Sequence, residues 1–138
     1  MAEWLESGIA ELWGGRSFRL PRCAHDRKPD GSWSAWSSDW AADVHIIETS
    51  GTASGASFTA HEMIDERTPG EPIEGLGWSG RLEVLTEQDG DRPVFRMAAA
   101  CGATNTLMSL YVSYLREDQY TFARSVVDSV EHRVPSPV

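Results

Sequence analysis

The chain has few cysteines, few basic residues and no long apolar run, and each shortage excludes a class of protein. Cys23 and Cys101 are the two cysteines among 138 residues, and they match no metal-binding or redox motif. We therefore expect free thiols and a cytoplasmic location. No apolar run has the length of a membrane span. The acidic start at Glu3, with no apolar segment after it, predicts the absence of a secretory signal peptide.

Basic residues are scarce relative to acidic ones. The chain carries 12 Lys and Arg against 21 Asp and Glu, which gives a formal net charge of −9. Nucleic-acid binding needs clustered positive charge, and an anionic membrane surface attracts basic segments for the same reason. We therefore expect neither nucleic acid nor a membrane as a partner, whereas an acidic surface would suit a basic protein.

The sequence also lacks the motifs of common enzyme families. It has no glycine-rich phosphate loop and no Gly-x-Ser-x-Gly segment. One partial match is present: His61 and Glu62 begin a segment similar to the zinc-protease helix His-Glu-x-x-His, but Asp65 replaces the second histidine. A hydrolase or metalloenzyme that uses these three residues is the lowest-ranked of our hypotheses. We expect no metal and no cofactor.

The second half of the chain has the clearer structural signals. Arg81–Glu87 and Val94–Cys101 are apolar runs on either side of an Asp-Gly turn signal, which predicts a β-hairpin. Thr106–Leu115 alternates apolar and mixed positions, as a strand does. From Asp118 to Glu131 the apolar spacing changes to the helical period. The prediction is two strands, a third strand and a closing helix.

The first half is predicted from shorter patterns. Apolar residues at helical spacing predict an amphipathic helix over Glu3–Trp13. Ser17–Leu20 and Ala41–Glu48 read as strands, and Arg22–Gly31 reads as a polar loop. Repeated Gly and Pro predict that Thr68–Gly80 is irregular.

These elements predict one α+β domain over residues 1–132. Its mostly antiparallel, twisted sheet would be packed by an N-terminal and a C-terminal helix. Residues 133–138, which include two prolines, are expected to form a flexible tail.

Tryptophan is concentrated in one segment. Trp33, Trp36 and Trp40 lie within nine residues, and Trp78 lies in the glycine-rich stretch further along the chain. Successive residues of a strand face opposite sides, so Trp33 and Trp36 could share a face only with a bulge or turn near Ser34. Either these rings cover one end of the core, or they form an exposed aromatic binding surface. We take the four tryptophans as the candidate binding residues.

Two short segments resemble a known superfamily. Ser17-Phe18-Arg19-Leu20-Pro21 near the start, and Tyr111-Val112-Ser113-Tyr114 leading into Asp118–Val130, are similar to the PsbP-like α/β/α sandwich superfamily. The resemblance implies a domain that binds other proteins, because bacterial members include adaptor-like accessory proteins. The chain also resembles class I type III secretion chaperones, which are small, acidic and typically dimeric, so a homodimer is a further option.

Our main functional hypothesis is therefore a non-enzymatic, cytosolic protein-binding module with an acidic, tryptophan-rich surface. An adaptor, a secretion-accessory protein and an immunity-type protein all fit this description. The alternative is a small-ligand-binding domain whose pocket is lined by the four tryptophans. In either case function depends on a site, which the fold alone does not specify.

Overall fold

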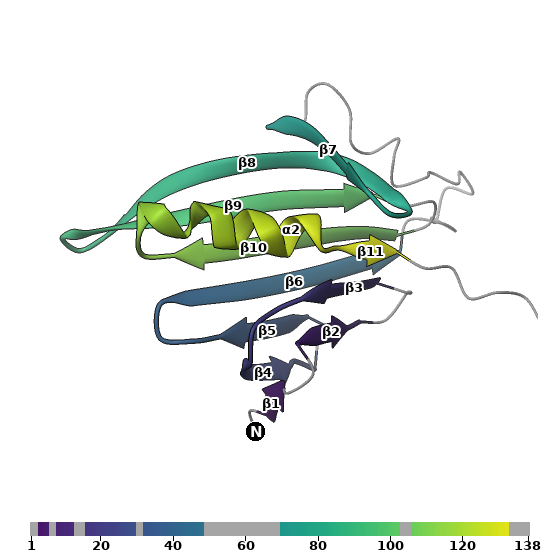
Figure 1. The fold of residues 1–138 in the computed structure, drawn as a ribbon, viewed down its shortest axis with the longest axis horizontal. Coiled ribbons are helices and arrows are strands. Elements are labelled where there is room, and N and C mark those ends of the chain that lie inside the picture. Colours follow the sequence, from purple (N-terminus) through teal and green to yellow (C-terminus); the bar gives the residue numbers. More distant parts are fainter. Residues whose placement is uncertain are drawn as a thin grey trace, which may run out of the picture.

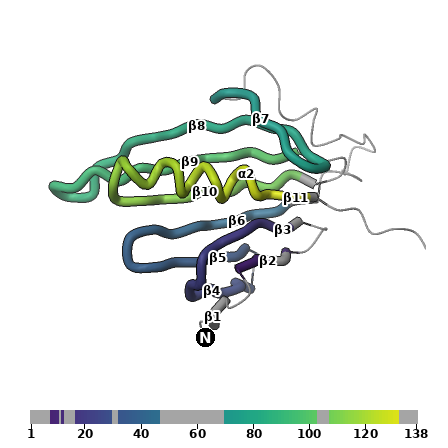
Figure 2. The backbone as a smooth tube through the Cα atoms, viewed as in Figure 1, coloured from purple at the N-terminus to yellow at the C-terminus, as the bar shows by residue number. Residues whose placement is uncertain are grey.

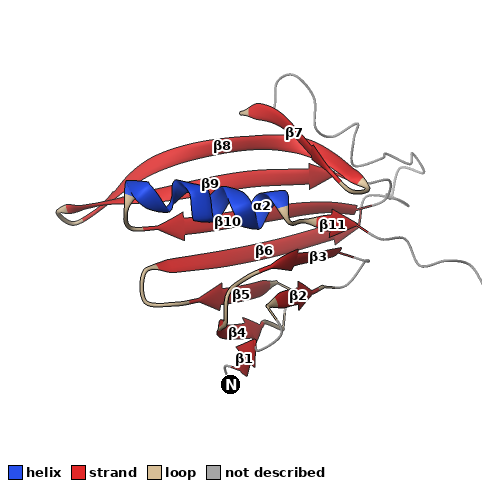
Figure 3. Cartoon of the chain, in the orientation of Figure 1, coloured by secondary structure: helices blue, strands red, loops and turns tan. Residues whose placement is uncertain are grey.

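The computed structural model describes residues 3–5, 8–12, 16–29, 32–48, 70–102 and 106–132. Most of these residues lie in β-strands (Figure 3). The elements are β1 (Glu3–Leu5), β2 (Ile9–Glu11), β3 (Arg16–Arg19), β4 (Cys23–Arg27), β5 (Trp33–Trp36), β6 (Trp40–Glu48), β7 (Glu71–Gly75), β8 (Trp78–Asp89), β9 (Arg92–Gly102), β10 (Thr106–Tyr114), the short 3-10 helix η2 (Glu117–Gln119), α2 (Tyr120–Asp128) and β11 (Glu131–His132).

The main sheet has eight antiparallel strands in the order β1-β4-β5-β6-β10-β9-β8-β7 (Figure 1). β4 to β6 and β7 to β10 each run as consecutive antiparallel neighbours. The two groups join where β10 pairs with β6, with Met108 opposite Ile46 and Val112 opposite Ala42. Strands from the two halves of the chain therefore meet at the centre of the sheet.

A small sheet and one helix lie together on one face of the main sheet. The small sheet has the order β11-β3-β2, and α2 contacts β3, β9 and β10. The backbone tube shows β11, the strand that follows α2, beside β3 (Figure 2). The Ser129 hydroxyl links the two parts, because its oxygen accepts a hydrogen bond from the Arg19 amide at 2.8 Å and donates one to the Val126 carbonyl at 2.7 Å.

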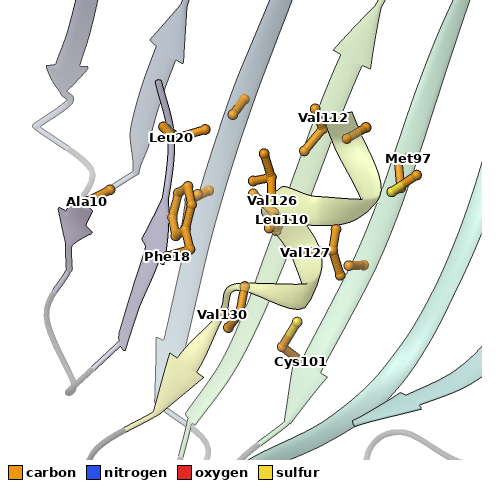
Figure 4. Packing of buried hydrophobic residues seen from close by; sticks show 14 of the residues in the cluster. Ala10, Phe18, Leu20, Met97, Cys101, Leu110, Val112, Val126, Val127 and Val130 are labelled. Atoms are coloured by element: carbon orange, nitrogen blue, oxygen red, sulfur yellow. The ribbon is translucent and has the colours of Figure 1, made fainter. Parts of the chain in front are cut away.

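The core lies between the main sheet and this second layer. Figure 4 shows Val126 and Val127 of α2 close to Leu110 of β10, with Phe18 of β3 beside them. Alternate residues of β10 are fully buried, as expected for the covered face of a strand with period 2: Met108, Leu110, Val112 and Tyr114. We name this covered side of the main sheet the inner face.

The prediction of an α+β domain, with its sheet packed by an N-terminal and a C-terminal helix, is wrong: the described residues are mostly β-strand, and α2 is the one short α-helix among them. The start of the chain forms β1 and β2 where the helix over Glu3–Trp13 was expected, although Trp13 itself lies outside the described residues. Gly8 sits between the two strands with φ of +75°, a backbone conformation that no right-handed helix contains. Its carbonyl accepts a hydrogen bond from the Leu20 amide at 2.9 Å, so the chain turns here to meet the segment that follows β3.

Two further stretches predicted to be irregular are strands. The expected polar loop over Arg22–Gly31 contains β4, in which Cys23 is buried. The expected irregular stretch Thr68–Gly80 contains β7 and the start of β8. β4 and β7 are short and largely polar, and they form because a neighbouring strand supplies their backbone hydrogen-bond partners.

The hairpin, the third strand and the closing helix are confirmed. β8 and β9 are longer than predicted and turn at Gly90, whose φ is +64°. The helix begins after Gln119, whose side-chain oxygen accepts hydrogen bonds from the amides of Leu115 and Arg116 at 3.2 and 3.0 Å. The bond from the Arg116 amide caps the start of η2, because Arg116 is the N-cap of that 3-10 helix.

Both thiols are expected to be unreactive in the folded protein. Cys23 is 1% exposed and Cys101 is fully buried, and burial raises the pKa of the Cys23 thiol. Because the thiolate is the reactive form, a colorimetric thiol reagent should label neither cysteine until denaturant is added and should then label both. Rapid stoichiometric labelling of the native protein would contradict the packing of β4 and β9.

Candidate functional site

The outer face of the main sheet, opposite the inner face, is the candidate functional surface. Directly paired residues of antiparallel strands point to the same side, so the registers define rows of side chains across the sheet. One row crosses six strands through Ala24, Trp36, Ala41, Ser113, Arg96 and Leu85. The neighbouring row consists of Asp26, Ser34, Asp43, Tyr111, Ala98 and Glu83.

No described element packs over this outer face. The described helix and the small sheet both lie on the inner face (Figure 1). Burial follows the same division: inner residues of β10 are at most 2% exposed, whereas Ser109, Tyr111 and Ser113 on the outer side are only half-buried. The outer face is therefore a broad sheet surface that no described element covers.

The outer face exposes one large apolar side chain on β5 and another on β8. Trp36 on β5 and Leu85 on β8 are each 38% exposed, and they occupy the same row. Between them lie the small residues Ala41 and Ser113, with Arg96. An apolar surface interrupted by small side chains can fit closely against another protein.

Tyr111 and Arg96 form the centre of the outer face. The Arg96 guanidinium carbon lies 5.9 Å from the centroid of the Tyr111 ring, within the range of a cation–π interaction. Its Nη1 atom is 3.6 Å from Glu87, while its Nε atom is buried and has no hydrogen-bond partner within the described ranges. Arg96 thus retains a donor that these contacts do not use.

Acidic groups outnumber basic groups on this surface. The Ser34 hydroxyl donates a 2.7 Å hydrogen bond to one carboxylate oxygen of Asp43. By the strand registers the outer face carries three arginines, Arg81, Arg92 and Arg96, and six acidic residues: Asp26, Asp43, Glu74, Glu83, Glu87 and Asp89. This balance follows the net charge of −9 and favours a basic partner.

The four candidate tryptophans are not brought together. Trp33, Trp40 and Trp78 are 5%, 8% and 4% exposed, whereas Trp36 alone of the four lies on the outer face. β5 is a regular strand with the burial pattern of opposite faces, so no bulge aligns Trp33 with Trp36. The structure therefore does not assemble a pocket lined by all four rings.

Each buried tryptophan has a structural partner. The Trp33 ring meets Phe18 edge-on at 5.6 Å, and its Nε1 donates to His25 Nδ1 at 3.2 Å. Trp40 packs against Phe122 at 5.3 Å between ring centroids. The Trp78 Nε1 donates a buried hydrogen bond to the Val130 carbonyl at 2.8 Å. These rings therefore connect the main sheet to the layer on its inner face.

The metalloenzyme hypothesis gains no support from the described part of the chain. His61, Glu62 and Asp65 lie outside the described residues, and within those residues no cluster of three His, Cys, Asp or Glu could hold a metal ion. Ser109 lies opposite His45 on the outer face, but no hydrogen bond between these described side chains joins them, and Asp43 is held by Ser34. The pair lacks the contacts of an activated nucleophile.

The clefts at the surface are shallow and partly occupied by ion pairs. One of about 590 Å³ is lined by Arg81 and Arg124. Arg124 already binds Glu71 and Asp128 at 2.9 and 3.1 Å, and these carboxylates raise the pKa of its guanidinium, Asp128 the most. A second cleft, of about 210 Å³, is lined by Trp40 and Tyr114. Burial is the main cause of the raised pKa of Tyr114.

Comparisons with known proteins support the fold and leave function open. No known family model matches the chain, and no curated protein does. The chain is similar to a crystal structure of a protein from Bacteroides thetaiotaomicron VPI-5482, with 12% sequence identity and a TM-score of 0.70. The match covers 95% of this chain and 50% of that protein, so this chain spans half of its length. At this identity the likeness shows a shared fold.

The described residues include no helix that is long and apolar enough to cross a membrane.

Proposed function

We propose that the chain is a non-enzymatic, cytoplasmic protein-binding module that binds its partner through the outer face. The observation that carries the proposal is the row from Trp36 to Leu85, which exposes large apolar groups on a sheet face that no described element covers. Arg96 lies in this row beside Leu85, and its guanidinium lies over the ring of Tyr111 in the neighbouring row. Tryptophan, tyrosine and arginine are the residue types that most often dominate binding energy at protein interfaces.

The partner should present a basic rim around an apolar patch. Asp26, Asp43, Glu83 and Glu87 lie around the apolar row, and complementary charge increases both the association rate and the specificity of a complex. This assignment agrees with the resemblance to PsbP-like proteins, which implies protein binding and remains a prediction. An adaptor, secretion-accessory or immunity role would each use such a surface.

In this proposal Trp36 is the one candidate tryptophan that contacts the partner. Trp33, Trp40 and Trp78 contact neighbouring elements within the fold, so their substitution would affect stability before binding. A small-ligand pocket formed by the four rings has no supporting geometry in the described residues.

Site-specific photo-crosslinking tests the proposal. A photoreactive phenylalanine analogue replaces Trp36 in one variant and Tyr120 in another; Tyr120 is 40% exposed on α2, away from the outer face. In lysate of the source organism, we expect a defined adduct from the position of Trp36 and none of that mass from the position of Tyr120. Equal adducts from both positions would contradict the outer face as the interface.

The captured partner then provides the quantitative test. Purified partner should bind wild type and Leu76→Ala equally, because Leu76 is an exposed apolar residue in the β7–β8 turn. Trp36→Ala should bind roughly tenfold more weakly, which corresponds to about 1.4 kcal/mol. Binding should weaken at high salt because exposed charges are screened. Equal affinity of the Trp36→Ala variant would contradict the proposal.

A further inference from the structure

The second half of β8 has an edge that no described strand pairs with. β7 covers β8 from Trp78 to Leu82, whereas β8 continues to Asp89 and pairs with β9 along this whole length. Every residue from Val84 to Asp89 is exposed, including Val84 at 40% and Leu85 at 38%. An uncovered strand edge offers backbone donors and acceptors to another strand.

The hairpin fixes which peptide groups face this edge. Asp89 and Arg92 flank the two turn residues Gly90 and Asp91, and residues in this position exchange hydrogen bonds with each other. Because such pairs alternate along an antiparallel ladder, odd-numbered residues of β8 bond to β9. The amides and carbonyls of Val84, Thr86 and Gln88 therefore face the open edge. Leu82, which pairs with Glu71 of β7, follows the same alternation.

The side chains along the edge specify the chemistry of an added strand. Glu83, Leu85 and Glu87 point to the outer face, whereas Val84 lies on the inner side opposite the buried Met97. Glu83 has no ion-pair partner among the described residues, and Glu87 has the 3.6 Å contact with Arg96. An added strand should therefore place cationic residues opposite Glu83 and Glu87 and apolar residues opposite Val84 and Leu85.

We propose that residues Glu83 to Asp89 of β8 accept an extended segment of the partner protein as an additional antiparallel strand. The segment alternates Lys or Arg with apolar and β-branched residues. Backbone hydrogen bonds to Val84, Thr86 and Gln88 supply affinity, and the carboxylates supply specificity. This inference rests on the proposed protein-binding function and adds its binding mode, because the edge adjoins the outer face at Leu85.

A second copy of this chain is a poor occupant of the edge. Two copies that pair through most of this edge would be related by a two-fold axis at Leu85 or at Thr86. The first arrangement places Glu83 of one copy opposite Glu87 of the other, and the second places it opposite Asp89. Like charges directly opposite each other destabilise strand pairing. The acidic edge therefore disfavours self-association and selects a cationic segment.

A synthetic peptide tests this binding mode. The peptide Thr-Lys-Thr-Val-Val-Lys, with blocked ends, places lysine opposite Glu87 and Glu83 when it runs antiparallel to β8. In amide proton–nitrogen NMR spectra of the full chain, we expect concentration-dependent shifts that are largest from Glu83 to Asp89. The same peptide with glutamate in place of lysine should cause none. Absence of shifts with the lysine peptide, or equal shifts with both, would overturn the proposal.

Two variants separate backbone pairing from nonspecific charge attraction. Thr86→Pro removes an edge-facing amide at a position where an edge strand tolerates proline, and it should weaken peptide binding on the order of tenfold. Thr86→Val keeps the amide and should bind like wild type. Should Thr86→Pro not fold, Glu83→Lys serves instead, because it turns one of the two opposing carboxylates into a cation and should abolish the preference for the lysine peptide over the glutamate peptide. Unchanged binding by the folded Thr86→Pro variant, or unchanged preference of Glu83→Lys, would refute strand addition.

Failure of this inference is distinguishable from failure of the proposed function. Crosslinking at the position of Trp36 reports on the outer face, whereas the peptide reports on the β8 edge. If a partner is captured through Trp36 and binds Thr86→Pro as tightly as wild type, the proposed protein-binding function stands and strand addition at β8 is refuted. Sedimentation velocity should show a monomer, and a concentration-dependent dimer lost in Thr86→Pro would show that a second copy occupies the edge, which also overturns the proposal.

Discussion

Replacement of Trp78 by alanine is expected to lower the free energy of unfolding by about 3–5 kcal/mol, the usual cost of truncating a large buried aromatic side chain. Trp78 is 4% exposed. Its Nε1 atom donates to the Val130 carbonyl at 2.8 Å in a buried hydrogen bond, which connects the start of β8 to the segment after α2. The substitution removes the packed ring and leaves the carbonyl without this donor. Urea-induced unfolding followed by far-ultraviolet circular dichroism measures the loss.

One variant separates the hydrogen bond of Trp78 from the packing of its ring, and a second repeats the truncation at an exposed tryptophan as a control. Trp78→Phe keeps an aromatic ring but removes the donor, so it should cost about 1–3 kcal/mol. Trp36→Ala removes the same side chain from the exposed outer face and should cost about 1 kcal/mol or less. If Trp36→Ala destabilised the protein as much as Trp78→Ala, the assignment of these two rings to interface and core would be wrong.

Replacement of Gly80 by alanine should be the most disruptive change of a single methyl group. A Cβ atom at Gly80 would overlap the carbonyl oxygen of Ala100 on the adjacent strand β9. Because the obstacle is backbone within a paired ladder, no side-chain rotation relieves it, and β8 must move away from β9. We expect a loss of at least about 3 kcal/mol in the free energy of unfolding, measured by the same denaturation experiment.

Gly90 provides the control for this substitution. It has φ of +64° in the β8–β9 turn, and no atom lies within 4 Å of an added Cβ. Gly90→Ala should therefore cost about 1–2 kcal/mol, from backbone conformation alone. A Gly80→Ala variant as stable as Gly90→Ala would contradict the close approach of β8 and β9.

The alternation of β10 was readable from the sequence because its apolar residues occur at every second position. Met108 and Leu110 are buried, and Ser109 and Tyr111 belong to the other face, as the pattern predicts. The closing helix was readable for a similar reason, since Ala123 and Val126 recur at helical spacing over a core strand.

The N-terminal segment could not be predicted in the same way. Its apolar spacing fits a helix, but Gly8 adopts a left-handed conformation, β1 pairs with β4 and β2 pairs with β3. Helical periodicity over one short segment does not outweigh such tertiary pairing. β4 was missed because its residues are largely polar, and its partners β1 and β5 stabilise it as a strand.

The candidate surface was only partly predictable. The sequence indicated that Ser109, Tyr111 and Ser113 share one face of a strand, but it gave no strand order. Only the order β5-β6-β10-β9-β8 places Trp36, Tyr111 and Leu85 on one continuous face. Trp33 and Trp36 could belong to one surface only with a bulge or turn near Ser34, whereas β5 is regular and its pleat places the two rings on opposite faces.

Hydroxyl-radical footprinting of the complex with the captured partner is the most direct test of the central claim. Oxidation of Trp36 and Tyr111 should fall in the complex, because the claim places both under the partner. Oxidation of Leu76 and Tyr120, which are exposed away from the outer face, should stay at the level of the free protein. Unchanged oxidation of Trp36 together with protection of Tyr120 would contradict the claim and place the interface on α2.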